Sequence, residues 1–148
     1  MGISIIGISN VKFEYNYDND INDTKIIYYD YENKKTYLRN DNSKEVYASR
    51  SYSGLAQLMR KLYKYSIDVD IKYNMINMPY DGFVNPSGKT YESQLFLNNI
   101  YNKLIEKFEE DEEILENTYD IGEWDIEFTG LMLEAFKLCN DSGILVFS

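Results

Sequence analysis

The hydrophobic periodicity of the chain changes near residue 50, and this change constrains the fold more than any other feature of the sequence. Before that point, apolar side chains tend to occupy every second position, as they do in half-buried β-strands. After it, they recur at every third or fourth position, as they do on the buried face of a helix. A chain whose strands come first and whose helices follow is typical of the α+β class.

The first fifty residues predict an antiparallel β-meander. Apolar and polar residues alternate over 11–17, and two β-rich runs flank the short polar loop 32–35, which is a hairpin signal. The expected strands lie at 11–17, 26–31, 36–38 and 45–48, with a turn at 18–23.

Three helices are expected in the remainder of the chain. They span 53–65, about 91–116 and 125–139, with Ser51 or Ser53 capping the first and Thr90 capping the second. The inward residues of the first helix are Leu55, Leu58, Met59, Leu62 and Tyr63, and those of the third are Phe128, Leu131, Met132, Ala135, Phe136 and Cys139.

Three further segments complete the expected architecture. Alternation over 67–73 predicts a short strand, and the segment 77–89, which holds both prolines, predicts a long loop. The apolar run 144–147 predicts a final strand at the centre of the sheet. We therefore expect a single domain over 1–148, with an N-terminal antiparallel β-meander, about three helices packed on one face and a short C-terminal strand.

Composition bounds the class of protein. A length of 148 residues and a hydrophobic content of 44% are enough for a substantial core. There is no apolar run of the ~20 residues that cross a bilayer, and the start of the chain lacks the basic leader of a secretory signal. Cys139 is the only cysteine, so no internal disulfide forms, and we expect a cytoplasmic protein in which this thiol is a core residue.

Several chemistries are excluded or disfavoured by the residues present. The chain has no histidine, which excludes Ser-His-Asp and Cys-His catalysis and the usual zinc sites. Asp18, Asp20 and Asn22 resemble the first ligands of an EF-hand loop, but Asp23 and Tyr29 stand where glycine and glutamate are required. We expect a solvated turn there, with no metal and no cofactor.

The segment 85–90 ends in the Gly-Lys-Thr of a phosphate-binding loop. Five residues separate Gly82 from Gly88, whereas the loop needs four for its backbone N–H groups to surround a phosphate. No hydrophobic run ending in aspartate supplies a magnesium ligand. A turn that leads into a helix is therefore the preferred interpretation.

Enzymatic activity is not expected. Glu123, Asp125 and Glu127 would lie on one side of an extended segment beside Trp124, a pattern that could serve sugar hydrolysis. A chain of this length without a clear deep cleft is an unusual glycosidase, so we do not assign these carboxylates a catalytic role.

Tyrosines are concentrated in the expected meander. Tyr15, Tyr17, Tyr29, Tyr31, Tyr37 and Tyr47 exceed what one core face requires. One interpretation is an exposed aromatic binding face, since tyrosine suits protein interfaces. The other is ordinary sheet packing combined with the codon bias of an A/T-rich genome.

Nearly all of the excess negative charge lies between Glu106 and Glu127. This window has a single base, Lys107, and carries −10, which is the formal net charge of the whole chain. The acids in it are Glu106, Glu109, Glu110, Asp111, Glu112, Glu113, Glu116, Asp120, Glu123, Asp125 and Glu127. Such a surface repels nucleic acid and anionic membranes and attracts a basic partner.

The location of the acids favours a functional interpretation. The run 109–113 lies near the expected end of the second helix, where each negative charge opposes the helix dipole by about 0.3–1 kcal/mol. Tyr119 and Trp124 are interleaved with the acids, and aromatic residues are common at interface hot spots. We predict a partner-binding site made of Glu106, Glu109, Glu110, Asp111, Glu112, Glu113, Glu116, Tyr119, Asp120, Glu123, Trp124 and Asp125. The alternative is a solvated helix end that only keeps the protein in solution.

The leading hypothesis is an inhibitor that occupies the basic, nucleic-acid-binding surface of a partner protein such as a nuclease. In size, charge and composition, though in no motif, the chain is similar to the small acidic anti-CRISPR and other anti-defence proteins of phages. An immunity protein that neutralises a bacterial toxin nuclease would use the same electrostatics. An alternative of another class is a nucleotide-binding or small-ligand-binding protein built on the tyrosines and the loop 87–90.

Overall fold

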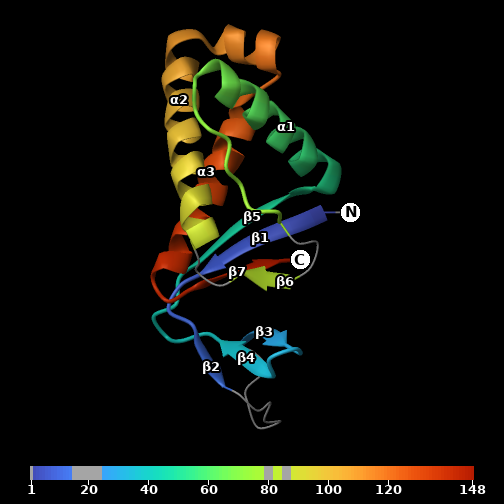
Figure 1. Ribbon diagram of the computed structural model, residues 1–148, viewed down its shortest axis with the longest axis vertical. Coiled ribbons are helices and arrows are strands. Elements are labelled where there is room, and N and C mark those ends of the chain that lie inside the picture. The colour runs from blue at the N-terminus through green and yellow to red at the C-terminus, as the bar shows by residue number, and fades with distance from the viewer. Residues whose placement is uncertain (1, 15–24, 79–81, 85–87) are drawn as a thin grey trace.

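The computed structural model describes residues 2–14, 25–78, 82–84 and 88–148. These residues form an α+β fold in three layers: the helices, a four-stranded sheet and a small three-stranded sheet (Figure 1). The four-stranded sheet is the middle layer, with the helices on one side and the small sheet on the other. None of the helices in this described part is both long and apolar enough to cross a lipid bilayer.

The middle sheet is antiparallel throughout. Its strands lie in the order β5 (Glu45–Ser51), β1 (Gly2–Ile8), β7 (Ile144–Phe147) and β6 (Gly82–Val84). All residues of β7 are buried, because the strand lies between β1 and β6 and has a layer on each face. This confirms the expected central position of the apolar run 144–147.

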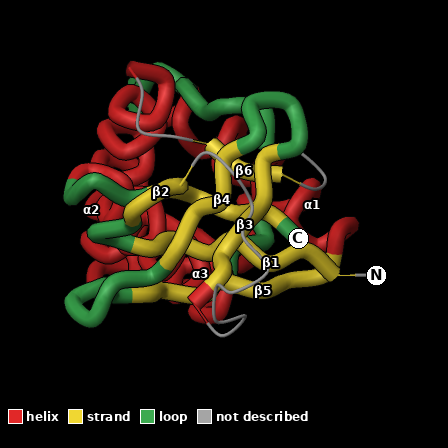
Figure 2. Tube along the Cα trace, turned by 90° about the horizontal axis from the view of Figure 1, so that it is seen from below, coloured by secondary structure: helices red, strands yellow, loops and turns green. Residues whose placement is uncertain are grey.

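The small sheet contains the predicted hairpin. Its strands lie in the order β2 (Lys12–Glu14), β4 (Lys35–Leu38) and β3 (Ile26–Asp30), and it crosses the strands of the middle sheet (Figure 2). Tyr37 packs with Ile144 and Val146 of β7 in a small hydrophobic cluster, which we call the second cluster to distinguish it from the main core beneath the helices. The strand expected at 45–48 exists as β5, but it pairs with β1 in the middle sheet and not with the hairpin. The expected turn at 18–23, together with Tyr15 and Tyr17, lies outside the described residues.

Three helices lie on the other side of the middle sheet (Figure 1). They are α1 (Tyr52–Asp68), α2 (Gly88–Tyr119) and α3 (Glu123–Lys137), and the 3-10 turn η2 (Leu138–Asn140) follows α3. Ser51 caps α1, since its side chain accepts a hydrogen bond of 3.0 Å from the backbone N–H of Gly54. α3 lies against β1 and β5, and its backbone at Ala135 approaches the backbone of Gly7 closely.

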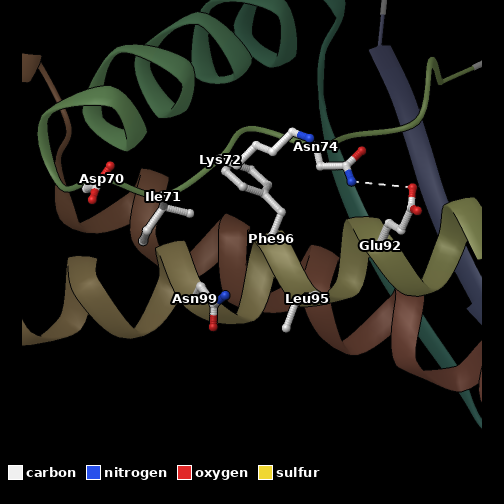
Figure 3. Close-up of a pocket in the computed structure, with 8 residues that line it drawn as sticks. All are labelled: Asp70, Ile71, Lys72, Asn74, Glu92, Leu95, Phe96 and Asn99. Carbon is white, nitrogen blue, oxygen red and sulfur yellow. Dashed lines mark hydrogen bonds between the residues drawn. The ribbon is translucent and has the colours of Figure 1, made fainter.

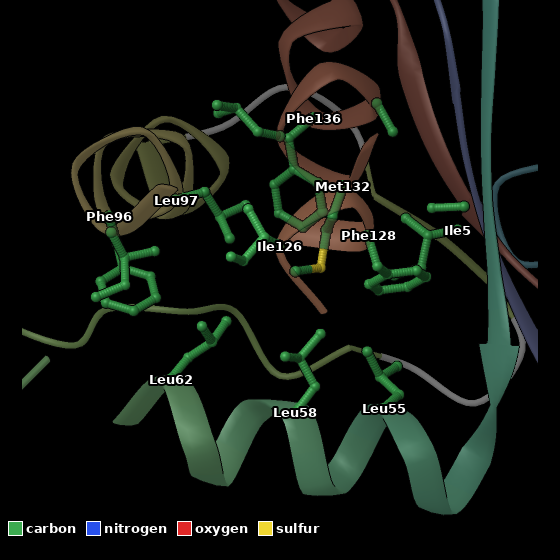
Figure 4. Packing of buried hydrophobic residues seen from close by; sticks show 14 of the residues in the cluster. Ile5, Leu55, Leu58, Leu62, Phe96, Leu97, Ile126, Phe128, Met132 and Phe136 are labelled. Atoms are coloured by element: carbon green, nitrogen blue, oxygen red, sulfur yellow. The ribbon is translucent and has the colours of Figure 1, made fainter. Parts of the chain in front are cut away.

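The main core fills the space between the helices and the middle sheet. Leucines of α1 point towards side chains of α2 and α3, and Ile5 joins them from β1 (Figure 4). The residues of α3 that were expected to face inward are buried, with the exception of Leu131, which is 42% exposed. In α1, Tyr63 is likewise 53% exposed, so these two inward assignments are wrong.

Cys139 is fully buried, as expected of a core residue. Burial raises the pKa of its thiol to about 12, because the apolar surroundings disfavour the thiolate. A thiol that stays protonated is a poor nucleophile, which agrees with a packing role.

The short strand expected over 67–73 is wrong. α1 continues to Asp68, and Asp70 has a φ of 58°, which lies in the left-handed region and cannot belong to a strand. Residues 69–78 contain neither helix nor strand. Their apolar side chains still pack against the main core, so the alternation reflects burial and not strand pairing.

Sequence reasoning missed β1 and misplaced two features near α2. β1 is apolar on both sides, since Ile5 faces the helices and Ile6 packs in the second cluster, so it lacks the alternation of a half-buried strand. β6 lies within the segment 77–89 that was expected to be a loop. Thr90 is not the N-cap of α2, because the helix begins at Gly88 and Thr90 is buried inside it.

Candidate functional site

The acidic window lies where α2 breaks and the chain turns into α3, at the end of the molecule farthest from the small sheet (Figure 1). Asp111 has φ −161° and ψ 85°, an extended conformation inside the span of α2. The helix therefore consists of two segments that meet at this residue. A single helix over 91–116, as the periodicity predicts, does not describe this region.

Asp111 begins the second segment in the manner of an N-cap residue. Its side-chain oxygen Oδ1 accepts a hydrogen bond of 3.4 Å from the backbone N–H of Ile114, three residues further on. Glu112 and Glu113 consequently occupy the first turn of a helical segment, where negative charge is favourable. The prediction that the whole run 109–113 opposes a helix dipole is therefore wrong for these two residues and holds only for Glu109 and Glu110.

This cap is testable by substitution. Asp111→Ala is expected to lower the free energy of unfolding by about 0.5–2 kcal/mol, because the first backbone N–H groups of the second segment lose an acceptor. Asp111→Asn keeps a side-chain oxygen and should remain within about 0.5 kcal/mol of the wild type. Urea unfolding followed by circular dichroism measures both, and equal losses in the two variants would mean that the oxygen does not cap the helix.

Nine acids of the window are exposed, and we call them the acidic corner: Glu106, Glu109, Glu110, Glu112, Glu113, Glu116, Asp120, Glu123 and Glu127. They belong to both segments of α2, to the turn and to the start of α3. Asp111 is half-buried and Asp125 is buried.

Few of the corner carboxylates are neutralised by the protein itself. Among the described residues, three of them form ion pairs: Lys103–Glu106 at 3.9 Å, Lys107–Glu110 at 3.6 Å and Lys61–Asp120 at 3.6 Å. The acidic side chains in these pairs remain 69%, 67% and 93% exposed. Exposed pairs of this kind contribute about 0–1 kcal/mol, so even these carboxylates stay available to a partner.

Tyr119 is directed at α1 and not at solvent. Its hydroxyl donates a hydrogen bond of 2.5 Å to Asp68, and its ring packs edge-on against Tyr65 with centroids 4.9 Å apart. The hydrogen bond to Asp68 is the main reason that the pKa of Tyr119 rises to about 12, with burial and the Asp68 charge adding to it. In this arrangement Tyr119 holds the end of α2 against α1 and offers little surface to a partner.

Asp125 is 6% exposed and binds the protein's own basic residues. It forms an ion pair with Arg50, lies 3.5 Å from the Lys61 ammonium, and accepts a hydrogen bond of 3.1 Å from the backbone N–H of Gly122 at the start of α3. Burial alone would raise the pKa of Asp125, but the hydrogen bonds from Arg50 and Gly122 and the nearby positive charges outweigh burial and lower it. Its place in the predicted partner-binding site is therefore wrong.

Trp124 is 65% exposed, but it also has an internal partner. The Arg50 guanidinium lies over the Trp124 ring at 4.9 Å and over the Phe128 ring at 5.3 Å. Trp124 thus packs against the Arg50 guanidinium and keeps the rest of its surface exposed. Nothing in the sequence signals this arrangement, because Arg50 and Asp125 are 75 positions apart.

The three carboxylates considered for sugar hydrolysis are not on one side. α3 begins at Glu123, so the segment is helical and not extended. Glu123 and Glu127 share an exposed face, as residues four apart do in a helix, whereas Asp125 points inward. The expectation that all three carboxylates lie on one side of the segment is therefore wrong.

The tyrosines do not form one aromatic face within the described residues. Tyr37 is buried between the two sheets, whereas Tyr31 is 83% exposed and Tyr47 is 53% exposed. Tyr29 packs edge-on against Tyr31, with centroids 4.5 Å apart. Tyr47 belongs to the middle sheet and Tyr31 follows β3 of the small sheet, so these rings are parts of two surfaces.

The structure has a pocket that could hold a small ligand, but the residues that line it differ from those named in the small-ligand hypothesis. A pocket of about 290 Å³ lies between the segment 70–74 and α2 (Figure 3). In it, the Asn74 amide donates a hydrogen bond of 3.3 Å to Glu92, and the Phe96 ring points towards Lys72. The loop 85–87 and the EF-hand-like segment 18–23 lie outside the described residues. Within those residues, no group of three or more acidic or cysteine side chains could hold a metal ion.

Comparison of the chain with protein-family models, with curated proteins and with solved structures finds no match in any of the three.

Proposed function

We propose that this protein binds a basic surface of a partner protein through the acidic corner, and so competes with the nucleic acid that the surface normally holds. The observation that carries the proposal is the exposure of nine carboxylates across the break in α2 and the start of α3. Carboxylates held on helices stand in for phosphates, and ions released from the partner's groove contribute to binding as they do for DNA. A surface of this charge also gives fast, electrostatically steered association.

The rigid attachment of the corner supports the same function. The Tyr119–Asp68 hydrogen bond and the Arg50–Asp125 pair connect the turn between α2 and α3 to α1 and β5. Charges on a fixed scaffold lose less conformational entropy on binding than charges on a mobile tail. An acidic run that served solubility alone would not need these connections.

The test compares equal losses of charge at two places. We expect the triple variant Glu109→Gln, Glu112→Gln and Glu113→Gln to bind a fluorescein-labelled nona-lysine peptide at least tenfold more weakly than the wild type. The matched control replaces three exposed acids remote from the corner: Glu14→Gln, Glu32→Gln and Asp41→Asn. Wild-type affinity should fall by about tenfold or more between 50 and 200 mM salt, since the interaction is ionic.

Binding of the native partner provides the second part of this test. Duplex DNA should displace the protein from the partner, because both occupy one basic surface. Equal losses in the two triple variants, or affinity that does not respond to salt, would contradict a role for the acidic corner.

A further inference from the structure

A groove of about 540 Å³ runs between α2 and α3 and continues from the acidic corner. Gly130, which lines the groove, has no side chain, and a Cβ there would lie 2.9 Å from the Tyr101 ring. The ring of Tyr101 can therefore lie close to the backbone of α3. Leu131, the residue expected to face inward, instead lines this groove with 42% of its surface exposed.

The groove has carboxylates as well as this apolar surface. Glu127 and Glu134 line it from α3, both are exposed, and neither forms an ion pair within the described residues. The exposed Lys137 lines the end of the groove beyond Glu134, so the carboxylates outnumber the single base there. The two glutamates are seven positions apart, so they lie about 10 Å from each other along the helix axis on nearly the same face. Asn98 and Asn102 of α2 line the opposite side. An aromatic ring and a leucine between two unpaired carboxylates suit a cationic side chain with a long apolar stem.

We propose that this groove receives arginine side chains of the basic partner, an inference that rests on the proposed function. A guanidinium stacks on an aromatic ring and binds a carboxylate with two parallel hydrogen bonds, whereas an ammonium ion supplies only charge. The protein already accommodates one arginine by ring stacking and charge pairing, since Arg50 lies over two aromatic rings and forms an ion pair with Asp125 through one of its nitrogens. The acidic corner thus attracts any polycation, and the groove selects those that present arginine.

The test measures the preference for arginine over lysine. This preference depends on the groove, whereas the attraction of any polycation depends on the acidic corner. We expect the wild type to bind labelled nona-arginine at least fivefold more tightly than nona-lysine at equal salt. Tyr101→Leu should reduce this ratio by threefold or more and leave nona-lysine affinity unchanged. Tyr101→Phe keeps the ring and should keep the ratio, and Tyr91→Leu, on the same helix but outside the groove, should keep it as well.

A second variant does not depend on the packing of Tyr101. The double variant Glu127→Gln and Glu134→Gln should weaken nona-arginine binding at least threefold more than it weakens nona-lysine binding, because Glu127 also belongs to the acidic corner and its charge contributes to both. The charge-matched control Glu14→Gln and Asp41→Asn should affect the two peptides equally. In a ¹H–¹⁵N spectrum, nona-arginine should shift the amide signals of Gly130 and Leu131 more than nona-lysine does.

The outcomes distinguish the two proposals. If both peptides bind with equal affinity, or if the arginine preference survives Tyr101→Leu, the groove is not an arginine site, while the acidic corner keeps its role. Preferential binding of a neutral leucine-rich peptide in the groove would also overturn the arginine assignment. Loss of all salt-dependent binding to nona-lysine would instead contradict the proposed function itself.

Discussion

Gly7→Ala is expected to lower the free energy of unfolding by about 3 kcal/mol or more, one of the two largest effects of a single substitution. A Cβ at Gly7 would lie 2.0 Å from the carbonyl oxygen of Ala135 and 2.6 Å from its Cα. These are backbone atoms of α3, so no side-chain rotation relieves the clash. The helix would have to move away from β1, and the core between them would lose its close packing.

Thermal unfolding measures this effect. For a chain of this size, a loss of 3 kcal/mol corresponds to a fall in Tm of about 6–12 °C. Gly2→Ala is the control within the same strand, because a Cβ there meets only the Arg50 carbonyl oxygen at 3.4 Å. If the Tm of Gly7→Ala fell no further than that of Gly2→Ala, the close packing of α3 on β1 would be wrong.

Asp125→Asn is expected to lower the free energy of unfolding by about 3–5 kcal/mol at pH 7. The Arg50 and Asp125 side chains in the pair are 10% and 9% exposed, so the substitution leaves a buried guanidinium without its counter-charge. One nitrogen of that guanidinium, Nη1, is already buried without a hydrogen-bond partner among the described residues. The asparagine keeps the shape of the side chain, which isolates the loss of charge.

Asp125 should also make the stability of the folded protein depend on pH. The pKa of Asp125 is lower in the folded protein than its ordinary value of 3.8, so the unfolded chain binds the proton more readily. The stabilising contribution of this carboxylate is therefore fully present above pH 3.8 and is lost as the pH falls through the folded-state pKa. The difference in stability between wild type and Asp125→Asn should shrink over that range.

The Arg39–Glu45 pair supplies the control. It also joins a guanidinium to a carboxylate, but these side chains are 32% and 24% exposed, and pairs near the surface contribute about 0–1 kcal/mol. Glu45→Gln should therefore cost much less than Asp125→Asn in urea unfolding at pH 7. Equal costs for the two variants would show that burial of the Arg50–Asp125 pair has no special effect.

The structure also changes the explanation of the acidic run. From the sequence, five acids appear at an unfavourable helix end, which suggests selection for binding alone. The break at Asp111 gives Asp111, Glu112 and Glu113 favourable places at a helix start. Their structural contribution and their exposure to a partner are compatible, because a capping acid needs only one oxygen for the backbone.

The parts of the fold that the sequence predicts are those with a strong local period. The helices α1 and α3 extend within a few residues of the expected ranges, since an apolar stripe at every third or fourth position needs no knowledge of its partner. β7 follows from a short run that is apolar on all sides. β1 has similar character but carries two glycines, and one of them is required only because α3 lies against it.

The sequence by itself determined three features of the protein. These are the α+β class, the identity of most helical residues that face inward, and the concentration of negative charge between Glu106 and Glu127. Only the tertiary structure decided which acids remain free, because Asp125 is neutralised by Arg50 from a strand 75 positions away. It also decided that Leu131 lines a groove, since that depends on the distance between α2 and α3. Periodicity is a property of neighbouring residues, whereas neutralisation and exposure depend on which distant segments come into contact.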